Sequence, residues 1–260
     1  MRLLATAMLL AASCGGSDKP AAGTPDTEPE GDDGKIELGD RSRTHQTRVP
    51  TMGDDDDDDD EPGVEVKGLK GRLDPYDIQA GVEPHFGSLT ACYADNLKRR
   101  RYLGGDITFK FTVDRQGGVK TVQLSKSDLG AWDVEKCMLG VARSMKFAAP
   151  KGGEADFTLP LEFDATRSVT WLEEEAGLAQ VKELKRELRA CAKENKTRTP
   201  RKVMVTLYVG TRGGVTSVGF ASAHKRPITD LWADCAETKI RAWVLSDPLG
   251  KVAKLAFRWN

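Results

Sequence analysis

The stretch Asp114-Arg-Gln-Gly-Gly-Val119 follows the run Asp106–Val113, in which apolar and polar residues alternate, and precedes a second predicted strand that carries Val119, Val122 and Leu124. Alternation with a period of two is typical of a β-strand with one buried face. A Gly-Gly pair between two such runs is typical of a β-hairpin, because glycine adopts the backbone conformations that a tight turn needs. The residues of the first run that we expect to face a core are Ile107, Phe109, Phe111 and Val113.

The same turn occurs a second time as Thr211-Arg-Gly-Gly-Val215. The run Val203–Val209 alternates before it, and apolar residues continue the pattern after it. Gly213 follows Gly117 by 96 residues. We therefore expect the two halves of the chain to repeat one fold.

Helical patterns flank each hairpin, and a third strand follows the second helix of each half. The helical ranges are Ile78–Leu97, Ala131–Phe147, Leu178–Cys191 and Ile228–Val244, and the third strands are Phe157–Phe163 and Lys254–Trp259. The order α-β-β-α-β therefore occurs twice. We predict an α+β fold with tandem domains over residues 71–166 and 167–260, each a three-stranded antiparallel sheet with helices on one face.

Four of the five cysteines fall on the predicted helices, one on each. Four cysteines allow three pairings. The duplication favours Cys92 with Cys137 and Cys191 with Cys235, because these pairs have nearly equal separations of 45 and 44 residues. In an oxidising compartment each bond would tie two helices together and stabilise its domain by about 4 kcal/mol. The alternative is four buried free thiols.

The amino terminus has the features of an export signal, with Arg2, the apolar run Leu3–Leu10, three small residues and then Cys14. A cysteine in this position resembles that of a bacterial lipobox, where it is acylated and becomes the first mature residue. The resemblance implies a signal peptide over residues 1–14, lipidation of Cys14, and an outer-membrane lipoprotein that faces the periplasm. We expect the protein to contact the membrane through this anchor alone. The alternative is a secretory peptide cleaved nearby, which leaves Cys14 free.

Residues 15–70 are predicted to form a disordered acidic linker, since they are rich in Gly, Pro, Asp and Glu and offer little to bury. Between Cys14 and Pro62 the net charge is −11, whereas residues 63–260 carry +9, which favours anionic partners for the folded part. Seven consecutive acids offer oxygen ligands for weak Ca²⁺ binding: Asp54, Asp55, Asp56, Asp57, Asp58, Asp59 and Asp60. This run lacks the glycine turn and spaced ligands of a calcium loop, so a solvated spacer is favoured and no specific metal site is predicted.

The first predicted domain resembles a known family at several positions. These are Cys92-Tyr93, Leu97, Gly117-Gly-Val119, Cys137, Phe147, Pro150, Gly152-Gly153 and Leu159-Pro-Leu-Glu-Phe163. Together they are similar to the AgmX/PglI carboxy-terminal domain, which belongs with the TonB-type carboxy-terminal domains of gliding-motility and envelope proteins. The resemblance covers Pro75–Asp164. Residues Glu173–Asn260 look like a diverged second copy, which keeps both cysteines and the turn but has Ala192 in place of the tyrosine and Trp243 in place of the phenylalanine.

The resemblance implies binding rather than chemistry, because TonB-type domains offer a small sheet to which a partner segment can add a strand. The strand expected to dock a partner carries Phe157, Leu159, Leu161 and Phe163. We expect a non-enzymatic adaptor for an envelope protein, in a motility or transport assembly, with no cofactor and no small-molecule substrate. His45, His85 and His224 have no partner at metal-ligand spacing, and Asp230 and Asp234 are better explained as helix caps than as an acid–base set with His224. An enzyme of unrecognised type is an alternative.

Basic residues cluster after the first helix of each predicted domain. They are Lys98, Arg99, Arg100 and Arg101 in the first and Lys193, Lys196, Arg198, Arg201 and Lys202 in the second. Cations complement the dipole at a helix C-terminus, but four consecutive bases exceed that need. We expect these segments to bind an anionic partner, namely lipid phosphate, cell-wall polymer, an acidic protein or the chain's own Asp54–Asp60 run. The alternative function is therefore a structural tether between outer membrane and cell wall; nucleic acid is not expected outside the cytoplasm, and few aromatic residues flank the basic segments.

Overall fold

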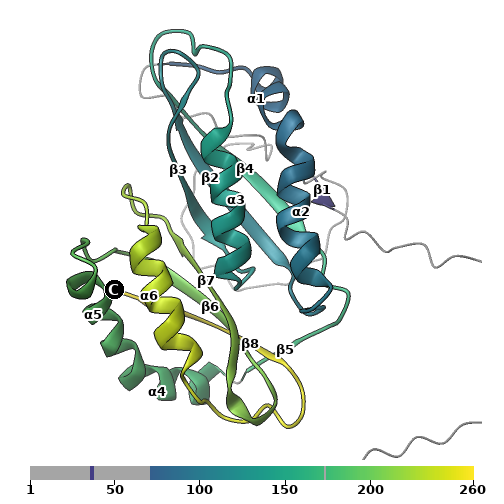
Figure 1. The fold of residues 1–260 in the computed structure, drawn as a ribbon, viewed down its shortest axis with the longest axis vertical. Coiled ribbons are helices and arrows are strands. Elements are labelled where there is room, and N and C mark those ends of the chain that lie inside the picture. Colours follow the sequence, from purple (N-terminus) through teal and green to yellow (C-terminus); the bar gives the residue numbers. More distant parts are fainter. Residues whose placement is uncertain (1–35, 38–70, 173) are drawn as a thin grey trace, which may run out of the picture. The chain divides into compact units, whose positions relative to one another are not determined.

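The computed structural model describes residues 36–37, 71–172 and 174–260. Repeat 1 (residues 71–166) consists of α1 (Pro75–Val82), the 3₁₀ helix η1 (Glu83–His85), α2 (Phe86–Leu97), β2 (Gly105–Val113), β3 (Val119–Ser127), α3 (Trp132–Ser144) and β4 (Ala155–Phe163). Repeat 2 (residues 167–260) consists of β5 (Thr170–Trp171), α4 (Glu174–Leu184), η2 (Lys185–Glu187), α5 (Leu188–Glu194), β6 (Val203–Val209), η3 (Thr211–Gly213), β7 (Val215–Ser222), α6 (Asp230–Arg241) and β8 (Ala253–Trp259). The predicted α+β composition and the repeated α-β-β-α-β order are therefore present (Figure 1).

Each repeat contributes one sheet, and both sheets have a fourth strand of two residues that the sequence did not predict. The strand order is β1-β4-β2-β3 in repeat 1, where β1 is Ile36–Glu37, and β5-β8-β6-β7 in repeat 2. The three predicted strands of each repeat pair antiparallel, whereas β5 runs parallel to β8, so the second sheet is mixed. The prediction of two three-stranded antiparallel sheets was wrong in these respects, because two residues are too few to show a period.

The first helix of each repeat is interrupted where the sequence predicts a continuous one. In repeat 1 the interruption η1 contains Pro84, which cannot donate a helical hydrogen bond. In repeat 2 the helix breaks at η2, which contains no proline. Figure 1 shows α2 beside α3 over the sheet of repeat 1. Among the described residues, no helix combines the length and the apolar character needed to cross a bilayer.

The repeated Gly-Gly turn has the same structural role in both repeats. Gly117 and Gly213 have φ values of +84° and +81°, which glycine adopts without strain. Their carbonyl groups accept the N–H groups of Phe147 and Leu245 at 2.9 and 2.8 Å. A Cβ on Gly117 would lie 2.0 Å from the carbonyl oxygen of Phe147, and one on Gly213 would lie 1.9 Å from that of Leu245. Each turn therefore holds the segment that leaves the second helix, and a side chain at the glycine would prevent this contact.

One disulfide joins two helices in each repeat. Cys92 of α2 is bonded to Cys137 of α3, and Cys191 of α5 is bonded to Cys235 of α6. The Cα atoms of the two pairs are 5.8 and 5.6 Å apart, a normal spacing for a disulfide. The pairing predicted from the duplication is confirmed.

The two sheets differ in how their second faces are covered. Burial alternates strictly along β4, so one face of that strand packs in the core and the other is accessible. In β6, by contrast, Thr206 and Tyr208 are 1% and 0% exposed although they point away from the core-facing positions of the strand. Their hydroxyl groups donate to main-chain carbonyls of repeat 1, those of Ser127 and Gly104. Repeat 1 therefore covers part of the second face of the sheet of repeat 2, and the two repeats belong to one structural unit.

Candidate functional site

The outer edge of β4 pairs with an earlier segment of the chain. Ile36 lies opposite Phe163 and Glu37 lies opposite Glu162, in antiparallel register. On its inner side β4 pairs along its whole length with β2. The segment that pairs with the outer edge is short, since β1 has two residues and β4 has nine. Most of the outer edge of β4 is therefore not paired with β1.

Pro160 determines which main-chain groups β4 offers at this edge. It lies opposite Thr108 in the uninterrupted ladder between β4 and β2. A proline has no N–H group, so Pro160 and Thr108 cannot exchange a pair of hydrogen bonds. In an antiparallel ladder the main-chain groups of such a position point to the other side of the strand, so the N–H group that Pro160 lacks would have pointed toward the outer edge. By the same alternation, the N–H and C=O groups of Thr158 and Glu162 point toward the outer edge. Glu162 already lies opposite Glu37 of β1, so a docking strand would find a donor at Thr158 and none at Pro160.

The docking residues predicted from the sequence lie on this strand, but their side chains do not reach its edge. They are 1–5% exposed and belong to the core: Phe157, Leu159, Leu161 and Phe163. Their side chains fix the strand in place. A partner would instead meet the β4 main chain and the side chains of its other face. The predicted strand-edge docking therefore stays a prediction, in which the β4 main chain and not these four side chains would contact a partner.

The strands at the opposite edges of the two sheets, β3 and β7, pack against each other. The Gln123 amide of β3 donates to the carbonyl groups of Ser222 and His224 at 3.4 and 2.7 Å. The Ser217 hydroxyl of β7 donates to the carbonyl of Gly130 in repeat 1 at 2.7 Å. These contacts cover part of β3 and β7 within the protein.

A buried carboxylate from α3 completes this junction. Glu135 is 0% exposed, and its two oxygens accept the Phe220 N–H at 2.7 Å and the Ser127 hydroxyl at 2.6 Å. Burial raises the pKa of Glu135 to about 7, although hydrogen bonds to the carboxylate act in the opposite direction. Gly219 of β7 permits the approach, because a Cβ there would lie 2.3 Å from a Glu135 oxygen.

Two ion pairs extend the junction between α3 and α6. Arg143 donates two hydrogen bonds to Asp230 at 2.8 and 2.9 Å, and Lys136 holds Asp234 at 2.8 Å. Partial burial alone would raise the pKa of Asp234. The hydrogen bonds from Lys136 and the Trp132 indole N–H, together with the charge of Lys136, lower this pKa below its ordinary value. Thr229 caps α6 through its side chain. The predicted role of Asp230 and Asp234 as helix caps was therefore wrong, and both residues join the repeats.

Arg100, one of the nine basic residues predicted to bind anions, is used within the protein. Its guanidinium contacts the Asp133 carboxylate and the Asn96 amide and donates to the Ser217 hydroxyl at 3.1 Å. The side chain is 16% exposed. Because its donors are already engaged, we remove Arg100 from the candidate anion site.

A buried lysine joins the two sheets beside this junction. Lys254 of β8 is 4% exposed and donates to Asp128 at 3.0 Å and to the carbonyl of Gly104 at 3.1 Å. The Asp128 carboxylate also accepts the Asp106 N–H at 2.6 Å. Burial raises the pKa of the Asp106 side chain, Asp128 adds to the rise, and Lys254 opposes it. The buried ammonium is thus compensated by a carboxylate from the other repeat, as burial of a charge requires.

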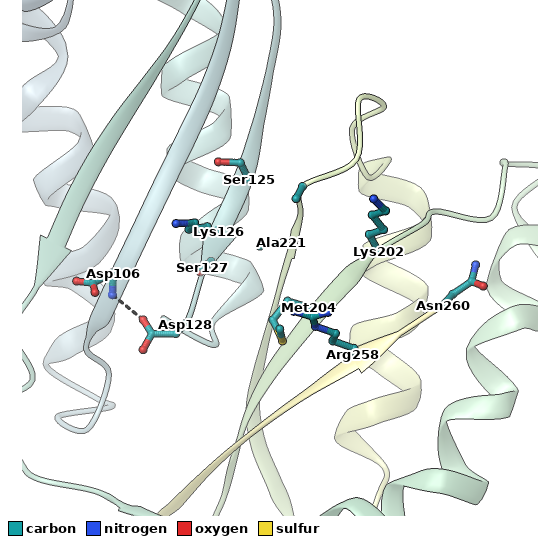
Figure 2. Close-up of a pocket in the computed structure, with 11 residues that line it drawn as sticks. Asp106, Ser125, Lys126, Ser127, Asp128, Lys202, Met204, Ala221, Arg258 and Asn260 are labelled. Atoms are coloured by element: carbon teal, nitrogen blue, oxygen red, sulfur yellow. Dashed lines mark hydrogen bonds between the residues drawn. The ribbon is translucent and has the colours of Figure 1, made fainter. Parts of the chain in front are cut away.

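A groove of about 730 Å³ opens between β3 and the strands of repeat 2 (Figure 2). Figure 2 shows Asp106 and Asp128 on the repeat 1 side, where the dashed line marks their hydrogen bond. Lys202 and Arg258 line the groove from repeat 2. Acidic and basic groups therefore face the same space, which does not select for a strongly anionic ligand.

The other predicted basic residues are exposed and belong to different surfaces. They are Lys98, Arg99, Arg101, Lys193, Lys196, Arg198, Arg201 and Lys202. Lys98 has Asp95 at 4.0 Å, and Lys202 lines the groove of Figure 2. Arg198 and Arg201 line a separate groove together with the loop between β7 and α6. The structure does not gather the predicted residues into one site.

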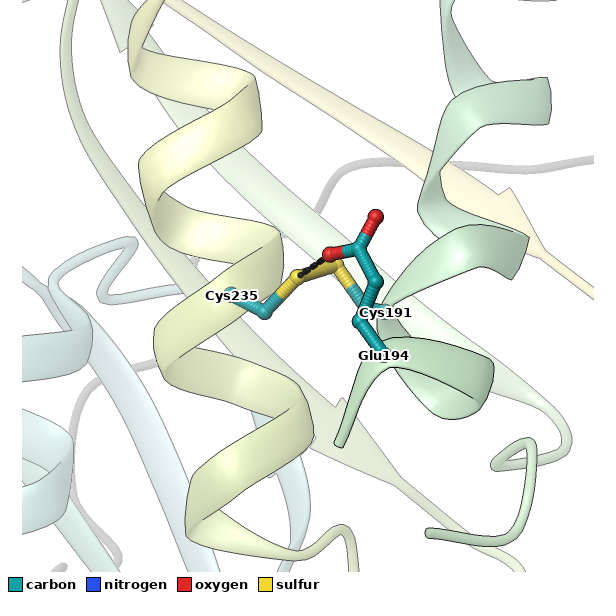
Figure 3. Close-up of side chains that lie close together, drawn as sticks. All are labelled: Cys191, Glu194 and Cys235. Atoms are coloured by element: carbon teal, nitrogen blue, oxygen red, sulfur yellow. Dashed lines mark hydrogen bonds between the residues drawn. A yellow bond between two sulfur atoms is a disulfide. The ribbon is translucent and has the colours of Figure 1, made fainter. Parts of the chain in front are cut away.

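Cys191, Glu194 and Cys235 are the one group in the described part of the chain whose potential metal-ligand atoms lie within 4.8 Å of one another (Figure 3). The two sulfurs are bonded to each other, and a disulfide sulfur is not the thiolate that zinc binds. The Glu194 carboxylate lies 3.5 Å from the Cys235 sulfur and pairs with Lys239 at 3.3 Å. We assign no metal to this group.

Several predicted features lie outside the described residues. These are the signal peptide over residues 1–14 with Cys14, most of the linker over residues 15–70, His45, and the run Asp54–Asp60. Lipidation, export and weak Ca²⁺ binding therefore stay predictions.

Comparison with known proteins gives no relative. Neither a scan against models of protein families nor searches among curated proteins and solved structures found a match to this chain. The resemblance to the AgmX/PglI domain stays a prediction, and function has to be argued from the geometry.

The junction between the repeats was missed by the sequence analysis, although the duplication contains a signal for it. Gln123 of β3 corresponds to Gly219 of β7, and Glu135 of α3 corresponds to Ala233 of α6. Positions at which two copies of a fold differ in size or charge mark surfaces that the copies use differently. Here those positions are the ones that touch across the junction.

Proposed function

We propose that this protein is a non-enzymatic, lipid-anchored adaptor of the cell envelope that binds partner proteins by strand addition to a TonB-like sheet. The observation that carries the proposal is the pairing of β1 with the outer edge of β4. An edge that accepts a strand from its own chain has the main-chain geometry to accept one from a partner. Lipid anchoring rests on the sequence around Cys14 and is a separate element of the proposal.

The outer edge of β4 is favoured over the other sheet edges for two reasons. The edges of β3 and β7 face each other and are partly covered by their mutual contact. The edge of β8 pairs with β5 at its first two residues, and near its end the Trp259 indole donates to the Lys185 carbonyl of η2 at 2.9 Å. The nine-residue β4 pairs with only two residues of β1, which leaves more of its length for a partner.

The proposal is tested by site-specific photocrosslinking in intact cells. A photoreactive amino acid at Thr158, on the outer edge of β4, should capture a defined envelope protein. The same substitution at Thr121, an exposed position on β3, is the matched control. The variant Thr158→Pro removes an outward N–H and leaves the ladder with β2 intact, so it should abolish capture by a crosslinker placed at Asp156. Equal capture from Thr158 and Thr121, or capture that survives Thr158→Pro, would contradict strand addition.

A second candidate function is a tether that binds anionic polymer through basic segments. It is favoured by the groove beside Arg198 and Arg201, where cations have no ion pair among the described residues. Recovery of wall polymer rather than protein from the crosslinking experiment would favour this candidate.

A further inference from the structure

Two loops of repeat 2 bring positive charge to one groove from both sides. The loop between α5 and β6 contributes Arg198 and Arg201, and the loop between β7 and α6 contributes Lys225 and Arg226. The groove has a volume of about 700 Å³. Within the described part of the chain, no acidic side chain lines it. Four formal positive charges therefore face one space.

The acidic residues nearest in sequence are engaged elsewhere and do not neutralise this charge. Glu194, which precedes the first loop, pairs with Lys239 at 3.3 Å. Asp230, which follows the second loop, pairs with Arg143 at 2.8 Å. No described carboxylate forms an ion pair with the four cations of the groove. The four cations of the groove are consequently not neutralised by an ion pair with a described carboxylate.

The two loops are held in position by hydrogen bonds that do not involve the basic side chains. The Ser222 hydroxyl bridges the loops, because it donates to the Arg201 carbonyl at 2.7 Å and accepts the His224 N–H at 3.1 Å. Gln123 of repeat 1 donates to the His224 carbonyl at 2.7 Å. A groove whose walls are already fixed loses less conformational entropy when a ligand binds.

The groove also offers neutral donors. The Nδ1 atom of His224 accepts the Arg226 N–H at 3.2 Å, which places the proton of the neutral ring on Nε2. Thr199 adds a hydroxyl group to the lining. Three guanidinium groups, one imidazole, one ammonium and one hydroxyl form a set of donors suited to oxygen-rich anions.

We propose that this groove binds a ligand that carries at least two neighbouring phosphate groups. Guanidinium groups match phosphate oxygens with paired hydrogen bonds, and a phosphomonoester brings up to two negative charges where a carboxylate brings one. A single phosphate would fill only a small part of about 700 Å³. The inference deepens the second candidate function, and it does not depend on the β4 edge.

The other grooves on the described surface are less suited to this ligand. The groove of Figure 2 has Asp106 and Asp128 in its lining. A groove of about 420 Å³ beside Arg99 has Asp133 in its lining. A carboxylate repels phosphate. A further groove beside Lys182, Lys185 and Arg189 has no acidic side chain in its lining, but its volume is only about 300 Å³ and its Arg186 pairs with Glu183 at 2.8 Å. The groove between the two loops of repeat 2 is therefore the favoured site.

The test measures binding of tripolyphosphate to the full chain, with its disulfides intact, by isothermal titration calorimetry at low salt. The variant Arg198→Gln/Arg226→Gln removes one guanidinium from each wall of the groove. The matched control, Arg99→Gln/Arg101→Gln, removes the same charge from an exposed loop of repeat 1. We expect the groove variant to bind about 10- to 100-fold more weakly and the control to stay within about twofold of the unchanged protein. Thermal melting checks that both variants are folded.

Three results would overturn the proposal: no binding of tripolyphosphate by the unchanged protein, equal weakening in both variants, or tighter binding of an Asp-heptapeptide than of tripolyphosphate at equal ionic strength. The source of phosphate is distinguished by a second assay. Vesicles of phosphatidylcholine with phosphatidylglycerol are compared with vesicles of phosphatidylcholine alone. If the unchanged protein and the control variant sediment with the anionic vesicles and the groove variant does not, the site binds lipid headgroups. Tripolyphosphate binding without vesicle binding assigns it to a soluble or wall-linked phosphate polymer. If the crosslinking experiment at β4 captures no partner, the tripolyphosphate and vesicle results keep their meaning, because neither depends on the β4 edge.

Discussion

The carboxylate of Glu135 in α3 accepts the N–H of Phe220 in β7 at 2.7 Å and thereby joins the two repeats. Strands at the edge of a sheet have unpaired N–H groups, which invite pairing with another chain. In this protein a side chain of repeat 1 satisfies one of these groups on repeat 2. The contact has no counterpart in the opposite direction, because Ala233 stands where Glu135 would be in the second copy. Glu135 therefore joins the two repeats in one direction only.

The first prediction concerns pH. Since burial raises the pKa of Glu135 to about 7, the folded protein keeps a proton that the unfolded chain has already lost between about pH 4.5 and pH 7. The contribution of protonated Glu135 to the free energy of unfolding is complete below this pH range. It is lost as the pH rises through the range, which lowers the free energy of unfolding by about 3 kcal/mol. In Glu135→Gln this part of the pH dependence should disappear, since an amide oxygen can still accept the Phe220 N–H. Urea unfolding at pH values from 4.5 to 8 measures the difference.

The matched control for this experiment is Glu154→Gln. Glu154 pairs with Lys120 on the surface at 2.7 Å, and this substitution should leave the slope of stability against pH unchanged. The interpretation fails if Glu135→Gln and the unchanged protein lose stability in parallel over this range.

A second prediction concerns the glycine that Glu135 approaches. In Gly219→Ala the new Cβ would lie 2.3 Å from a Glu135 oxygen, so α3 or β7 has to shift. We expect a loss of about 1–3 kcal/mol in the free energy of unfolding. Gly214→Ala in the same repeat is the control, because a Cβ there meets no atom within 4 Å. Equal midpoints for the two variants in chemical denaturation would show that the junction tolerates displacement of Glu135.

The sequence predicted those features that depend on residues close together in the chain. The turns at Gly117 and Gly213, the strands beside them and the helices bearing the cysteines all have local patterns. Glu135 has none: a charged residue within a helical pattern is normally solvent-exposed, and here it is buried by a strand 85 residues later.

The anion groove illustrates the same limit for the candidate site. Arg198 and Arg201 stand in a basic segment that the sequence analysis singled out. Lys225 and Arg226 come more than twenty residues later and meet them only because β6 and β7 are neighbours in the sheet. Charge composition could therefore indicate an anionic partner, while the choice among the basic segments required the fold. The sequence predicted the strand β4, but only its pairing with β2 and β1 shows which of its main-chain N–H and C=O groups face the outer edge.

The last prediction concerns the order in which the two disulfides are reduced. Thiol exchange requires access to a sulfur. Cys137 in repeat 1 is exposed, whereas Cys191 is 0% exposed and Cys235 is half-buried beside Glu194. The Glu194 carboxylate also repels an incoming thiolate, so two effects protect the bond in repeat 2. We expect limiting reductant, followed by alkylation and mass spectrometry, to label Cys92 and Cys137 first. In Glu194→Gln the disulfide in repeat 2 should be reduced faster, while the disulfide in repeat 1 keeps its rate of reduction. Labelling of Cys191 and Cys235 before Cys92 and Cys137 in the unchanged protein would show that access does not govern the order.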